Sequence, residues 1–156
     1  MDIKTENLTI LFVDIAGFTS TTARQSRVQN ARTLDSFNRA LLPLIKRFKG
    51  RVIKSIGDAL LLTFRSPTDA MLCAMALQDA IHEYNIRVTE EEKIHIRVAA
   101  SLGEVRVANK DVFAEPVNVA SRIESITPAD EVYLSEAIYL AMNKAFQRSA
   151  EGKKQM

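Results

Sequence analysis

The chain has 156 residues, 47% of them hydrophobic and 26% charged, which suits one globular domain that buries roughly 70% of its unfolded surface. Its formal net charge of only +2 leaves no electrostatic footprint for DNA or RNA, so we expect no nucleic-acid partner. With one cysteine, no apolar leader and no run of about 18 apolar residues, the sequence indicates a cytoplasmic protein without disulfides or membrane spans.

The first predicted strand covers residues 8–14 and is apolar on both faces, which is typical of a central strand. It ends at Asp14, and a glycine turn and the start of a helix follow. A carboxylate at the C-terminal end of a central strand is a common position for ligand chemistry. The simpler interpretation makes Asp14 a helix-capping acid near Thr19, and this segment alone does not decide between the two.

A helix is predicted over residues 22–49, with Gly50 as the residue that ends it. Two apolar runs then flank the pair Gly57-Asp58, which predicts a β-hairpin over residues 50–64. Gly57 can adopt the positive φ of the turn and would present Asp58 at a fixed tip. Lys54 lies in the same hairpin, and the simplest role for it is a salt bridge with Asp58.

Further elements follow in the remaining sequence. Ser66 and Pro67 predict the start of a helix that ends near residue 84 and places Cys73 in the core. A long strand is predicted over residues 94–102, and Gly103 directly after it allows a bulge or a close backbone approach. A second strand that ends near residues 111–113 then precedes a helix at 116–126, a short strand at 131–134 and a last helix capped by Ser135. The order predicts an α+β fold with a ferredoxin-like βαββαβ sheet layered with helices.

This sheet order would bring Asp14 next to Asp58. Two carboxylates a few ångströms apart repel each other unless they are protonated or bridged by cations, and their hard oxygens suit Mg²⁺ or Mn²⁺. The backbone N–H groups of Gly17, Phe18 and Thr19, in the turn after Asp14, could bind phosphate oxygens. Ordinary salt-bridged carboxylates without a metal remain the alternative.

Three segments, at residues 11–19, 50–58 and 111–122, together resemble the class III nucleotidyl cyclases, specifically the catalytic domain of adenylate cyclases. The segments are LFVDIAGFT, GRVIKSIGD and DVFAEPVNVASR, and they occur in the family's order. The resemblance covers about residues 8–146. We therefore expect a cyclase catalytic domain over residues 1–146, followed by a frayed C-terminal tail over residues 147–156.

The resemblance implies that Asp14 and Asp58, with the carbonyl of Ile15, hold two Mg²⁺ or Mn²⁺ ions. One ion would lower the pKa of the ribose 3′-hydroxyl and the other would bind the triphosphate. Lys54 and Asp111 match the pair that reads the purine, with a donor for adenine N1 and an acceptor for its exocyclic amine. Relatives that make cyclic GMP usually carry an acid and a small residue at these positions, so the resemblance favours ATP.

The resemblance also implies that Asn118 positions the ribose and that Arg122 stabilises negative charge at the α-phosphate as pyrophosphate leaves. The family is a head-to-tail dimer with its sites at the interface. Asp14 and Asp58 would come from one protomer and the other four residues from its partner. The expected activity is conversion of ATP to 3′,5′-cyclic AMP and pyrophosphate, a step in signal transduction.

The chain departs from the family pattern at two places. Family members continue past the last helix into a hairpin that carries a lysine for the terminal phosphates, and here only Lys144, Lys153 and Lys154 remain as substitutes. Ala114 also stands where a glycine is common. The alternative is therefore a catalytically weak or silent cyclase-like module for dimerisation or nucleotide binding. We expect the family's regulatory domains to be absent from this chain.

Overall fold

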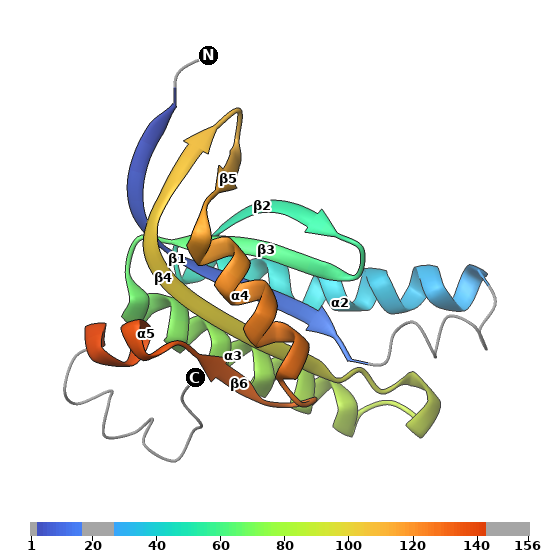
Figure 1. Ribbon diagram of the computed structural model, residues 1–156. Helices are drawn as coiled ribbons and strands as arrows, with labels where there is room; N and C mark the ends of the chain where they lie inside the picture. The colour runs from blue at the N-terminus through green and yellow to red at the C-terminus, as the bar shows by residue number, and fades with distance from the viewer. Residues whose placement is uncertain (1–2, 17–26, 143–156) are drawn as a thin grey trace.

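The computed structural model describes residues 3–16 and 27–142. Six strands form one sheet in the order β2-β3-β1-β4-β5, and β6 pairs with β4 (Figure 1). The elements are β1 (Lys4–Ile15), α2 (Arg27–Arg47), β2 (Arg51–Ile56), β3 (Ala59–Phe64), α3 (Pro67–Ile86), the 3₁₀ helix η1 (Glu90–Glu92), β4 (Ile96–Ala108), β5 (Asp111–Phe113), α4 (Glu115–Ile126), β6 (Val132–Leu134) and α5 (Glu136–Ala141).

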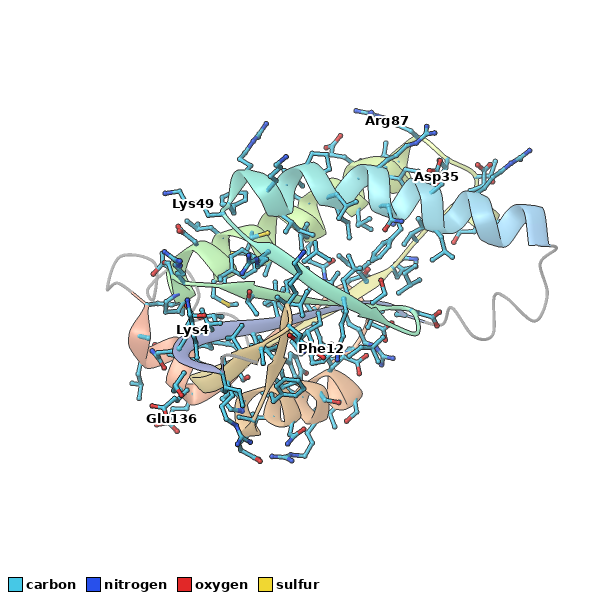
Figure 2. All side chains as sticks on the ribbon, turned by 90° about the horizontal axis from the view of Figure 1, so that it is seen from above. Lys4, Phe12, Asp35, Lys49, Arg87 and Glu136 are labelled. Carbon is cyan, nitrogen blue, oxygen red and sulfur yellow. The ribbon has the colours of Figure 1, made fainter. Side chains whose placement is uncertain are left out.

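The helices cover the two faces of the sheet unequally. Helices α2, α3 and α5 pack on one face and enclose the larger core, whereas α4 lies alone on the other face (Figures 1 and 2). Phe12 of β1 belongs to the smaller core beneath α4, and its neighbours Leu11 and Val13 belong to the larger one. The predicted α+β fold, with its βαββαβ order, is confirmed. Within the described residues, no helix is both long and apolar enough to cross a membrane.

Strand β1 is the central strand, as its apolar sequence predicts. It pairs antiparallel with β3 on one side and with β4 on the other. Both β1 and β4 are longer than predicted. Gly103 continues β4 instead of ending it, and the added residues of β4 pair with the added residues at the start of β1. A Cβ on Gly103 would lie 2.7 Å from Cγ of Pro116, so this glycine allows α4 to approach the sheet closely. The close-approach interpretation of Gly103 is confirmed.

The end of α2 corrects the role predicted for Gly50. Lys49, not Gly50, adopts the left-handed conformation, with φ of 66°. The N–H of Gly50 donates to the carbonyl of Ile45 at 2.8 Å and that of Lys49 to Lys46 at 3.0 Å, which is a Schellman ending. A Cβ on Gly50 would lie 2.6 Å from Cζ of Phe64, so this glycine serves close packing rather than backbone freedom.

Helix α3 begins as its sequence predicts. The hydroxyl of Ser66 accepts a hydrogen bond from the N–H of Asp69 at 3.1 Å, and Pro67 occupies the first helical position. Cys73 is fully buried, and burial raises the pKa of its thiol to about 12. Cys73 is therefore a small core residue with an unreactive thiol, as expected.

The residue that precedes α4 generates a stability prediction. Ala114 has φ of 130° and ψ of −176°, a backbone region that costs a residue with a side chain about 1–3 kcal/mol. We expect Ala114→Gly to relieve this strain and, after the entropic cost of glycine, to raise the free energy of unfolding by about 1 kcal/mol. Urea unfolding of the two proteins measures the change. A less stable variant would show that position 114 carries no strain.

Candidate active site

Asp14 and Asp58 lie near each other where the paired strands β1 and β3 end. Asp14 lies opposite Ala59 in the register, and Asp58 directly precedes Ala59 in the two-residue turn that follows Ile56. Gly57 has φ of 58°, as a Gly-first hairpin turn requires. Burial and then the charge of Asp14 raise the pKa of the Asp58 carboxyl. The two acids therefore interact, as the sheet order predicted.

Arg97 of β4 and Glu124 of α4 join this acid pair. Arg97 lies opposite Asp14 in the β1–β4 register, and its Nε and Nη2 donate to Asp14 Oδ2 at 3.2 and 3.1 Å. Its Nε is also 3.0 Å from Glu124 Oε1. The single N–H on Nε is directed at Asp14, so the buried Oε1 of Glu124 has no hydrogen-bond donor among the described residues. Sequence reasoning did not find either residue.

Glu124 carries the most strongly perturbed carboxyl of this group. Burial, then a hydrogen bond with Asp14 and the charge of Asp14, raise its pKa from 4.5 to about 7, and the charge of Arg97 opposes this increase. A negative Glu124 would place a second carboxylate directly beside Asp14. Acidic side chains are thus concentrated at this end of the sheet, and the guanidinium of Arg97 balances part of their charge.

The acid pair fits a divalent cation of the magnesium type. A cation between Asp14 and Asp58 would offset the burial of Asp58 and its repulsion by Asp14, which together raise the pKa of Asp58, and oxygen is the ligand that Mg²⁺ prefers. Within the described residues, no three His, Cys, Asp or Glu side chains gather as a metal site, so substrate and water would complete the shell. Ile15 ends β1 beside Asp14, and the part predicted for its carbonyl stays a prediction.

Several predicted contributors lie outside the described residues. These are the phosphate-binding backbone groups of Gly17, Phe18 and Thr19 and the three C-terminal lysines at positions 144, 153 and 154.

Lys54 and Asp111 meet across the two edges of the sheet. Lys54 Nζ lies 2.9 Å from Asp111 Oδ2, and their side chains are 43% and 28% exposed. A bulge between Val52 and Lys54 shifts the register of β2, so this strand twists toward β5. The hydrogen bond from Lys54 lowers the pKa of Asp111. The simple salt bridge of Lys54 with Asp58 is therefore wrong, whereas the predicted pair of Lys54 and Asp111 is assembled.

Asn118 and Arg122 are exposed and lie four residues apart on α4, as predicted. Arg122 Nη2 forms an ion pair with Glu115 Oε1 at 2.6 Å, and this contact, with a hydrogen bond from Asn118, lowers the pKa of Glu115. Around a helix, Arg122 and Glu124 are separated by about 200°. Because Glu124 faces Asp14, Arg122 faces away from the acid pair of its own chain.

The pKa of Glu124 predicts how stability depends on pH. Between pH 4.5 and about 7 the folded chain binds more protons at Glu124 than the unfolded chain, so its contribution to stability falls as pH rises. In buffer with a chelator, Glu124→Gln should remove this fall and gain about 1–2 kcal/mol over the parent at pH 8. Thermal unfolding from pH 5 to 8 measures it. The matched control, exposed Glu115→Gln, should show no such gain, and equal behaviour of both variants would contradict the assignment.

Comparisons with known proteins identify the family to which this sequence and fold belong. The sequence pattern of the adenylate and guanylate cyclase catalytic domain matches residues 2–156. The chain is 42% identical over 143 residues to the serine/threonine-protein kinase pkn2 of Myxococcus xanthus, covering 92% of this chain and 17% of that protein. It is 34% identical over 130 residues to the putative adenylate cyclase 3 of Rhizobium meliloti (strain 1021), covering 83% of this chain and 22% of that protein.

The chain thus spans about a fifth of the length of these curated relatives. Among solved structures, the guanylyl cyclase Cya2 superposes with a TM-score of 0.84 at 24% identity, covering 92% of this chain and 82% of that one, which supports the fold. Since the family pattern matches nearly the whole sequence and the fold is shared, the resemblance is confirmed: this chain belongs to the adenylate and guanylate cyclase catalytic domain family, the class III nucleotidyl cyclases.

Proposed function

We propose that this chain is the catalytic domain of an adenylate cyclase, which converts ATP to 3′,5′-cyclic AMP and pyrophosphate as a head-to-tail homodimer. The observation that carries the proposal is the position of Asp58 near Asp14 at the end of the central strand, where burial and then the charge of Asp14 raise the pKa of the Asp58 carboxyl. Such a pair has little structural value without a cation, and a cation there suits a triphosphate substrate.

The two acids would hold Mg²⁺ or Mn²⁺ ions, which lower the pKa of the ribose 3′-hydroxyl and bind the triphosphate. Asn118 would orient the ribose so that its 3′-oxygen attacks the α-phosphorus, while the bond to the pyrophosphate oxygen breaks. Arg122 would leave Glu115 and place its guanidinium on the α-phosphate, where negative charge develops. Because the Arg122–Glu115 pair is exposed, this exchange of partners costs little.

The pair of Lys54 and Asp111 supports ATP over GTP. Adenine has an acceptor at N1 and a donor at its exocyclic amine, which match a lysine ammonium and a carboxylate. Guanine has a donor at N1 and an acceptor at O6, which place each group opposite its like. The 2.9 Å contact between the two side chains keeps them at one place on the surface, where a single purine edge can contact both.

The orientation of α4 supports a dimer. Glu124 on its inner face interacts with Asp14, so Asn118 and Arg122 on its outer face point away from the acid pair of their own chain. A second copy of the chain supplies the missing groups in a symmetric way, since an arrangement that completes one site completes the other.

Mixing two inactive variants tests the shared site. Asp58→Ala removes an acid and Arg122→Ala removes the guanidinium, and each homodimer should lose at least about 100-fold in cyclic AMP formation with Mn²⁺-ATP. An equal mixture that exchanges subunits contains heterodimers with one intact site and should regain about a quarter of the parent activity. No recovery would show that both groups act within one protomer.

The parent chain is the reference for this experiment, assayed at high protein concentration so that dimers form. Calorimetric binding of ATP without cyclic AMP formation would select the silent module instead. Neither binding nor turnover would overturn both readings of the site.

The base preference has its own test. The double variant Lys54→Glu with Asp111→Ser exchanges the donor and acceptor pattern, so the ratio of cyclic GMP to cyclic AMP formed from equal GTP and ATP should rise at least about tenfold. The control Lys110→Glu changes the same charge at an exposed neighbour of Asp111 and should leave the ratio unchanged. An unchanged ratio in the double variant would show that other residues read the base.

A further inference from the structure

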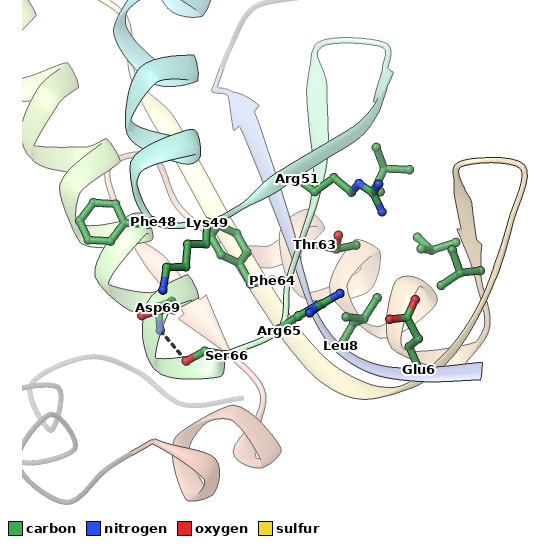
Figure 3. A pocket seen from close by; sticks show the side chains of 13 residues that line it. Glu6, Leu8, Phe48, Lys49, Arg51, Thr63, Phe64, Arg65, Ser66 and Asp69 are labelled. Carbon is green, nitrogen blue, oxygen red and sulfur yellow. Dashed lines mark hydrogen bonds between the residues drawn. The ribbon is translucent and has the colours of Figure 1, made fainter. Parts of the chain in front are cut away.

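A second concave site lies on the same face of the sheet as α4 but beyond the start of that helix. It is a cavity of about 600 Å³ (Figure 3). Leu8, Ile53, Val107 and Val112 line it from four different strands and also belong to the smaller core. Because α4 begins only at Glu115, it does not extend over this end of the apolar face, where other neighbours bury Leu8 and Val112.

The cavity is separate from the acid pair. Leu8 and Asp14 lie six residues apart on β1, which corresponds to about 20 Å along a strand. None of the residues proposed to bind metal, purine, ribose or phosphate lines the cavity. Ile53 and Val112 are nevertheless the chain neighbours of Lys54 and Asp111, so the cavity lies directly behind the predicted purine readers.

Two arginines give the cavity its polarity. Arg51 pairs with Thr63 in the β2–β3 register, and Arg65 follows two residues after Thr63, so both side chains emerge on the same face. Figure 3 shows both side chains extending over the cavity, with Glu6 across from them. Within the part of the chain that the structure describes, neither guanidinium has an ion pair or a side-chain hydrogen bond.

The remaining charges do not cancel these two. Glu6 faces the same space without forming an ion pair among the described residues. Lys49 and Asp69 lie together at the other end of the cavity, near the starts of β2 and α3 (Figure 3). The lining therefore carries three cations and two carboxylates, and its positive side is the arginine end.

We propose that this cavity binds a small organic anion, with an apolar ring or chain against Leu8, Ile53 and Val112 and a carboxylate or phosphate held by Arg51 and Arg65. Its volume falls in the range of small-molecule sites, which combine apolar walls with a few placed polar groups. Two guanidiniums without carboxylate partners are the donors best suited to a planar carboxylate or a phosphate. The site does not depend on the cyclase reaction.

Calorimetry with three probes that share one ring tests the site: 1-naphthyl phosphate, 1-naphthoate and uncharged 1-naphthol, added to the chain in buffer with a chelator. At least one of the two anions should bind at least about tenfold more tightly than 1-naphthol. Phosphate-only binding identifies a phosphate ligand and carboxylate-only binding a carboxylate ligand. Binding of neither anion, or equal binding of 1-naphthol, overturns the proposal.

Matched variants place the binding in the cavity. The double variant Arg51→Gln with Arg65→Gln should weaken binding of the anion at least about tenfold, and each single variant should weaken it less. The control Arg106→Gln removes an exposed arginine between Val105 and Val107, on the opposite face of β4, and should bind like the parent.

Asp58→Ala, inactive under the proposed cyclase mechanism, should also bind the anion like the parent, which separates this site from the acid pair. Unchanged binding in the double variant, or loss in Asp58→Ala, overturns the assignment to the cavity. Thermal unfolding of each variant shows that a loss of binding is not a loss of fold.

Discussion

The burial of Asp58 beside the charge of Asp14 is the constraint on which this candidate site depends. The register of β1 with β3 fixes the positions of both acids. Asp14 lies opposite Ala59, and Asp58 is the turn residue directly before Ala59. At the tip of a hairpin, an acidic side chain would otherwise point into water. Here burial and then the charge of Asp14 raise the pKa of Asp58, and a cation bound as proposed would offset this cost.

Arg97 explains how the chain tolerates this arrangement. It donates two hydrogen bonds to Asp14 from the neighbouring central strand, and its charge also acts on Glu124. Asp14 is only 13% exposed, so this ion pair is screened by water much less than the other pairs of the site. A cation bound as proposed would therefore compete with Arg97 for the same carboxylate oxygen.

The sequence predicted those features of the fold and site that local chemistry determines. The apolar run of β1, the glycine of the hairpin turn at Gly57 and the cap at Ser66 each follow from a few neighbouring residues. Arg97 and Glu124 could not be found in this way, because their roles depend on the β1–β4 register and on the rotation of α4. The contact of Lys54 with Asp111 spans 57 residues and needs the bulge in β2, so only the family resemblance indicated that these two residues act together.

Helix α4 separates two groups of candidate site residues on its two faces. Glu124 on its inner face interacts with Asp14, and Arg122 on its outer face forms an ion pair with Glu115. The helix cannot rotate to exchange these faces, because Ser101 donates to the carbonyl of Pro116 and the missing side chain at Gly103 admits the proline ring. The strained backbone at Ala114 joins this fixed helix to β5, so the position of Asp111 is coupled to that of Arg122. Under the proposed function, a short connection thus joins the candidate purine-binding Asp111 to the helix that carries Arg122, which suits a site assembled between two subunits.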